Sequence, residues 1–246
     1  MFTGRGIACP RGRRLAKIVR VNSVMRTVSL PAEIARPSVN HAAIADRVAR
    51  QPDSLPELFA GLRSDKPRIK YGCLKVLRLI SERNPAMLYP AFEQFGELLR
   101  SEFTVLQWGA IIILGNLAVI DSENKIDAIL DRYLQPIPGP VMITAANTIQ
   151  GAGKIARAKP YLADKITRAL LQVERAKYKT AECRNVVLGH AVLSLDLLFD
   201  HVREPRPVIA FVQRQLRNRR NATKRKAAVF LKRHGPAARG ASSRSA

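Results

Sequence analysis

Few residues in this 246-residue chain are spaced for chemistry, and no common catalytic template fits them. Residues 151–154 (GAGK) resemble part of a phosphate-binding loop. That loop, however, needs Gly at the position of Thr148 and Ser or Thr at the position of Ile155. Ser194 and the three cysteines have no adjacent histidine base. The sequence therefore predicts neither a nucleotide-binding loop nor a nucleophilic triad.

Acidic and histidine side chains also fail to form a set with metal-ligand spacing. Asp196, Asp200 and His201 are close in sequence, and we interpret them as solvated groups at a helix end. A second acidic series recurs at every fourth position, as on the solvated face of a helix. Its members are Glu123, Asp127 and Asp131. We therefore assign no catalytic, metal or cofactor-binding residue and expect no cofactor.

Basic side chains are more informative, because the chain carries 42 Lys and Arg against 19 Asp and Glu, a formal charge of +23. One group of three basic residues and a tyrosine follows three- and four-residue steps, so its members share one face of a helix. Its members are Arg68, Tyr71, Lys75 and Arg78. A second group is dense enough to contact phosphates, although a solvated terminal helix would look the same. Its members are Arg217, Arg219, Arg220, Lys224, Arg225 and Lys226.

The ends of the chain differ in composition from the middle. Residues 1–30 hold seven basic residues and no acid, and we expect 1–38 to be a disordered or targeting-like basic extension. Residues 235–246 are expected to form a disordered tail.

The three cysteines are far apart and predict no disulfide framework, which favours a cytoplasmic location. An organelle is the alternative if 1–38 is a transit peptide.

The elements that position these residues are predicted to be helices in a repeating pattern between residues 41 and 234. Apolar residues recur at three- and four-residue steps, and no strand signal appears. The longest apolar run, residues 109–120, is too short to span a membrane. A shorter helix followed by a longer one is expected about five times. The expected pairs are 55–62 with 66–83, 85–99 with 102–119, 123–134 with 138–158, 161–175 with 180–199, and 205–217 with 221–233.

The second helices of these pairs align with one another. Tyr71, Trp108, Thr144 and Asn185 then fall at equivalent positions, separated by 37, 36 and 41 residues. Small residues recur inside the same helices, where Gly costs roughly 1 kcal/mol relative to Ala, so close packing between helices has to compensate. These small residues are Gly72, Gly109, Gly115, Ala145, Ala146, Gly151, Gly153, Gly189 and Ala191.

With this period and pattern, as in residues 65–72 (DKPRIKYG), the chain resembles the HEAT-repeat and armadillo-type α-solenoid superfamily. The resemblance implies an all-α, right-handed α-solenoid of about five HEAT-like hairpins over residues 41–234. It also implies that the second helices line a concave groove. Members of this superfamily are mostly protein-binding scaffolds, with a few nucleic-acid binders and enzymes.

Two enzyme groups within the superfamily bear on function. HEAT-like metal hydroxylases use paired His-Glu dipeptides, and none of the four histidines here precedes Glu. HEAT-like alkylpurine DNA glycosylases use aromatic residues and an acidic residue in a basic cleft. Trp108 fits the aromatic position, but no carboxylate lies between Glu102 and Asp121.

We therefore expect a non-enzymatic binding or scaffold module. It would engage a protein partner through its concave face and carry a basic C-terminal region. The candidate binding residues are Trp108 and the two basic groups named above. The alternative is a nucleic-acid-binding HEAT-like protein related to the alkylpurine DNA glycosylases.

Overall fold

The computed structural model describes residues 29–235, and in this range the chain forms α-helices and short 3-10 turns without strands. The α-helices are α1 (Leu30–Ile34), α2 (His41–Arg50), α3 (Leu55–Gly61), α4 (Pro67–Arg83), α5 (Phe92–Leu98), α6 (Thr104–Leu117), α7 (Lys125–Leu134), α8 (Met142–Ala158), α9 (Ala163–Leu171), α10 (Ala181–Leu198), α11 (Pro205–Gln215) and α12 (Asn221–His234). The 3-10 turns are Pro52–Ser54, Pro85–Met87, Tyr89–Ala91, Ala118–Ile120, Pro160–Leu162, Gln172–Glu174 and Phe199–His201. Residues 1–28 of the expected extension and 236–246 of the expected tail lie outside the described residues.

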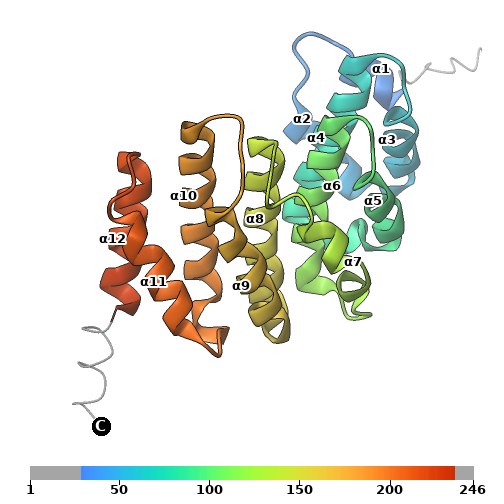
Figure 1. Cartoon of the computed structure of the whole chain (residues 1–246). Coiled ribbons are helices and arrows are strands. Elements are labelled where there is room, and N and C mark those ends of the chain that lie inside the picture. The colour runs from blue at the N-terminus through green and yellow to red at the C-terminus, as the bar shows by residue number, and fades with distance from the viewer. Residues whose placement is uncertain (1–28, 236–246) are drawn as a thin grey trace, which may run out of the picture.

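Five pairs of a shorter and a longer helix match the predicted repeat. The pairs are α3 with α4, α5 with α6, α7 with α8, α9 with α10, and α11 with α12 (Figure 1). Helix α4 has Pro67 in its first turn, where a missing N–H costs little, and it ends at Arg83, the last residue of the predicted range 66–83. The all-helical hairpin architecture is confirmed.

A sixth pair, α1 and α2, precedes these five and corrects the expected start of the fold at residue 41. Leu30 and Ile34 of α1 are buried, and α1 packs on α3 and α4. The backbone N–H of Leu30 donates to Oε2 of Glu57 at 2.8 Å. Helix α1 was not predicted because it has only five residues and follows an Arg-rich segment, so its sequence looks like part of the basic N-terminal extension.

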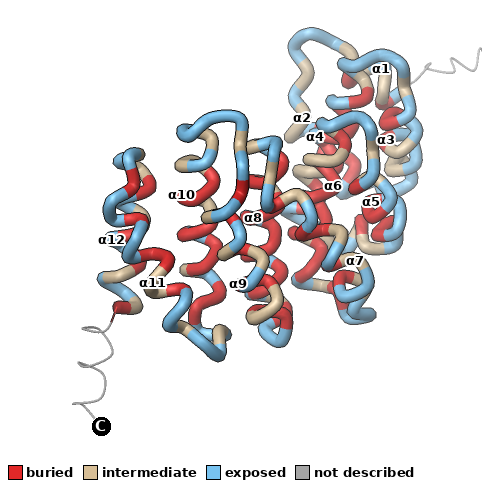
Figure 2. The backbone as a smooth tube through the Cα atoms, in the orientation of Figure 1, coloured by how far each residue is buried: buried red, intermediate tan, exposed pale blue. Residues whose placement is uncertain are grey.

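The helices form two layers. The longer helices α4, α6, α8, α10 and α12 contact one another in chain order, and α2 packs beside α4. We call these six helices the inner layer. The shorter helices α3, α5, α7, α9 and α11 form the outer layer (Figure 1). Buried residues concentrate where the two layers meet and between neighbouring inner helices, and they form one continuous core from Leu30 to Phe230 (Figure 2). In the described part of the chain no helix is both long and apolar enough to cross a membrane.

Small residues let the inner helices approach closely, as the sequence predicted. A Cβ added to Gly115 of α6 would lie 2.9 Å from the Cα of Gly151 in α8, so the two backbones are in contact. The hydroxyl of Tyr133 occupies the remaining space and donates to the carbonyl of Ile111 at 2.8 Å. The contact between α6 and α8 therefore requires glycine on both helices.

Candidate binding face

The solvent-exposed side of α4, α6, α8, α10 and α12 is the candidate functional surface, and we call it the inner face. Each helix buries its apolar side against the outer layer and its neighbours, so the remaining residues at three- and four-residue steps are exposed. A row of polar, basic and apolar side chains therefore runs across the inner layer.

The first predicted basic group lies together on α4, toward the N-terminal end of this surface. Arg68, Tyr71 and Lys75 are exposed, and Nη1 of Arg68 donates to the carbonyl of Ala35 at 3.3 Å. Arg78 is half-buried, and its Nε has no hydrogen-bond partner in the described structure. This part of the inner face is basic and has unused donors.

Trp108 occupies the predicted position on α6, but its indole is already engaged. Its Nε1 donates to Oγ1 of Thr144 on α8 at 2.7 Å. These two residues are equivalent positions of successive repeats in the sequence alignment. Trp108 therefore links adjacent hairpins, and its half-buried ring contributes to the inner face beside that link.

The second predicted basic group lies at the other end of the array, on α12 and the segment before it (Figure 1). Arg220 pairs with Glu182 of α10. Lys226 is half-buried, and burial, followed by the charge of Arg220, lowers its pKa. The other members of the group are exposed and have no ion-pair partner in the described chain. They are Arg217, Arg219, Lys224 and Arg225. The structure thus does not bring the two predicted basic groups together.

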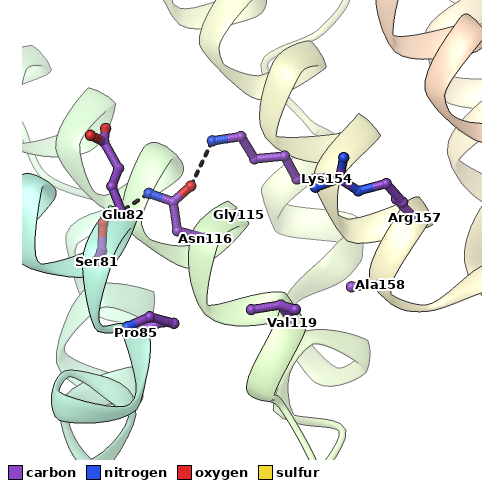
Figure 3. Close-up of a pocket in the computed structure, with 9 residues that line it drawn as sticks. All are labelled: Ser81, Glu82, Pro85, Gly115, Asn116, Val119, Lys154, Arg157 and Ala158. Atoms are coloured by element: carbon purple, nitrogen blue, oxygen red, sulfur yellow. Dashed lines mark hydrogen bonds between the residues drawn. The ribbon is translucent and has the colours of Figure 1, made fainter.

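Between these ends, a recess of about 350 Å³ opens on α4, α6 and α8 (Figure 3). Its lining residues are Ser81, Glu82, Pro85, Gly115, Asn116, Val119, Lys154, Arg157 and Ala158. We refer to it as the central recess.

A chain of hydrogen bonds crosses the central recess and links three inner helices. Nζ of Lys154 donates to Oδ1 of Asn116 at 2.6 Å, and Nδ2 of Asn116 donates to Oγ of Ser81 at 2.9 Å (Figure 3). The Ser81 hydroxyl in turn donates to the carbonyl of Arg78 at 2.7 Å. Both ends of the Asn116 amide are therefore hydrogen-bonded, and the ammonium group of Lys154 lies at the recess.

Three of the acidic residues singled out in the sequence, Asp127, Asp131 and Asp196, have structural partners. Asp127 accepts from Tyr161, and Asp131 pairs with Lys165, so both lie in contacts between α7 and the α9 hairpin. Asp196 pairs with Arg233 and His234 of α12. Within residues 29–235 no group of histidine, cysteine and acidic residues is arranged to hold a metal ion.

Comparison with known proteins identifies the fold. The sequence matches no protein-family model and no curated protein. The structure is similar to a designed armadillo repeat protein, with a TM-score of 0.59 at 12% identity, over 82% of this chain and 98% of that one. It is also similar to an engineered protein, with a TM-score of 0.53 at 14% identity, over 83% of this chain and 87% of that one. The chain has an armadillo/HEAT-like α-solenoid fold. At these identities the likeness shows the fold alone.

The sequence did not reveal the central recess of the solenoid, although it held a signal. Asn116 interrupts the apolar run 109–120, and it lies 35 residues after Ser81 and 38 before Lys154. Those separations are close to one repeat, so the three side chains meet on neighbouring helices. A search for polar residues one repeat apart within apolar helices would have found them.

Proposed function

We propose that this α-solenoid is a non-enzymatic binding module that holds a protein partner on its inner face. The supporting observation is that large apolar side chains of the inner layer and of the turn after α6 are exposed, since exposed apolar groups that cluster mark interaction sites. These side chains are Val119, Ile143, Leu193, Leu197 and Val229, each more than 40% exposed, and Leu193 and Val229 line one recess.

Basic side chains lie among these apolar residues. Leu193 and Val229 line one recess together with Arg225 and Lys226, and Val119 lines the central recess with Lys154. Apolar area supplies affinity, whereas surrounding charges select the partner and steer its approach. The inner face therefore has the mixture of groups that a protein interface needs.

A paired pull-down from native lysate tests this proposal. Val119→Asp and Leu193→Asp place a charge on the inner face and should abolish capture of a partner that the wild type retains. Leu216→Asp is the control, because Leu216 is 44% exposed at the end of α11 in the outer layer. A partner retained equally by all four proteins would contradict binding at the inner face.

Nucleic-acid binding is the second candidate function, and the basic group before and on α12 supports it. Arg217, Arg219, Lys224 and Arg225 are exposed without ion-pair partners in the described residues, so they remain free to contact phosphates. Salt-titrated binding to duplex and single-stranded DNA distinguishes the two functions. Release of a modified base from alkylated DNA is the separate test for glycosylase activity.

We also propose a cytoplasmic location, because free cysteines are typical of reducing compartments. Cys73 and Cys183 are free thiols in the structure. Burial raises the pKa of the Cys73 thiol to about 11, so it stays protonated and unreactive. Immunofluorescence of the tagged full chain, compared with a variant lacking residues 1–28, would test both this location and the organellar alternative.

A further inference from the structure

The central recess carries opposite charges on its two sides. Lys154 and Arg157 come from α8, whereas Glu82 comes from α4 and extends away from them (Figure 3). A ligand seated between α4 and α8 therefore meets positive charge on one side and negative charge on the other. This polarity can fix the direction in which a ligand lies.

The two cations on α8 are available in different ways. The bond to Asn116 uses one of the three ammonium donors of Lys154 and leaves two. Arg157 is exposed and has neither a hydrogen-bond nor an ion-pair partner within residues 29–235.

Part of the recess lining, beside the polar Asn116 and Ser81, is apolar. Val119, which is 69% exposed, Pro85 and Ala158 form this part. A ligand that presents only phosphate or another anion would leave these groups in water. A ligand with an apolar group beside its anion would cover them.

We infer that the central recess binds an acidic residue of the protein partner, with its carboxylate on Lys154 and Arg157 and a neighbouring apolar side chain over Val119. A basic or neutral polar residue then lies toward Glu82. This inference rests on the proposed function and names the chemistry of the partner: an acidic and apolar peptide segment. The apolar part of the lining, Pro85, Val119 and Ala158, favours such a segment over a nucleic-acid backbone, which would supply charge alone.

Selection of peptides from a random library displayed on phage, against the full chain, tests this assignment. The selected sequences should pair Asp or Glu with a large apolar residue. The corresponding synthetic peptides are then measured by fluorescence anisotropy against the wild type and the double variant Lys154→Glu, Arg157→Glu. Exposed ion pairs contribute little individually, but reversing both charges adds repulsion, so we expect affinity to fall by about tenfold or more.

Two controls make the result specific. Arg168→Glu changes an exposed arginine on α9 in the outer layer and should leave affinity unchanged. A peptide whose acidic residue is replaced by Lys should bind the double variant better than the wild type. Because Lys154→Glu removes the bond to Asn116, thermal melts confirm folding. The single variant Arg157→Glu, which loses no partner in the described structure, decides the case if the double variant is unstable.

Each contrary outcome has a distinct meaning. Peptides that lose binding on Leu193→Asp but not on charge reversal would overturn the recess assignment and leave the proposed function intact. If no peptide depends on either change, both proposals fail. Single-stranded DNA that competes for the wild type but not for Arg157→Glu would reassign the recess to phosphate.

Discussion

Asp121 lies at the junction between α6 and α7 and joins two hairpins. Its Oδ1 accepts from the Tyr89 hydroxyl at 2.6 Å, and its two oxygens accept from the backbone N–H groups of Lys125 and Ile126. Nζ of Lys159 lies 3.2 Å from Oδ2, and the side chains of this pair are only 6% and 0% exposed. Burial raises the pKa of Asp121, but its hydrogen bonds from Tyr89, the backbone and Lys159 outweigh burial and lower that pKa below 3.8.

Replacing Asp121 by Asn should destabilise the protein strongly, because Lys159 then remains buried without its counter-charge. Loss of one partner of a buried ion pair costs about 3 kcal/mol or more. The folded-state pKa is lowered, so this stabilisation is present above the unfolded pKa and is lost as the pH falls through the folded value. Thermal melts from pH 7 to pH 2 should therefore show the difference between wild type and variant shrinking in acid.

Asp131→Asn is the control for this measurement. Asp131 also pairs with a lysine of the next hairpin, Lys165, but its side chain is 85% exposed. Exposed pairs contribute little, so no measurable change in melting temperature is expected. Equal effects at Asp121 and Asp131 would show that burial is not what makes the first pair important.

Sequence reasoning did not predict the role of Asp121. A single aspartate after an apolar run has the composition of an ordinary loop, and its partners Tyr89 and Lys159 lie 32 and 38 residues away. Only the stacking of hairpins brings these groups together. The contacts of single residues between repeats therefore depend on how the hairpins are aligned with one another, and composition alone does not determine that alignment.

At the scale of elements, the repeat register was predictable because small residues and apolar spacing are local signals. Trp108 and Thr144 were aligned by sequence, and they are hydrogen-bonded in the structure. The pair α1 and α2 was missed because α1 is too short to show helical periodicity. The hydrogen-bond chain from Ser81 through Asn116 to Lys154 was missed for a different reason, since side-chain partners on neighbouring helices leave no local sequence pattern.

Gly115→Ala should destabilise the solenoid although Ala is the better helix former. The added Cβ would lie 2.9 Å from the backbone of Gly151, so α6 and α8 would have to separate. Overpacking of this kind costs about 1–3 kcal/mol, against roughly 1 kcal/mol gained in helix propensity, so we expect a net loss of up to about 2 kcal/mol. Denaturant unfolding followed by circular dichroism measures the net change.

Gly96→Ala provides a matched control in α5. A Cβ there meets no atom within 4 Å, so the substitution gains helix propensity without a clash. We expect unchanged or slightly higher stability. If Gly115→Ala were as well tolerated as Gly96→Ala, close approach would not be the reason for glycine at the contact between α6 and α8.

At the scale of the whole molecule, the charge of +23 should produce salt-dependent attraction to polyanions. Arg219, Lys224 and Arg225 are exposed toward the C-terminal end of the array, where they have no ion-pair partner in the described chain. Neutralising all three to Gln should reduce the slope of log affinity for duplex DNA against log salt by about 3, because each of these side chains would neutralise one phosphate.

The same titration separates general attraction from a dedicated nucleic-acid site. Arg157→Gln removes one charge from the central recess, away from α12, and it should leave the slope nearly unchanged if DNA binds at α12 and the segment before it. A slope that falls by about 1 for Arg157→Gln, the same amount per charge as for the triple variant, would mean that the net charge attracts DNA without a defined site. Tight binding that persists at physiological salt and depends on Arg219, Lys224 and Arg225 would instead make nucleic acid the principal ligand, because counterion release alone becomes weak under that condition.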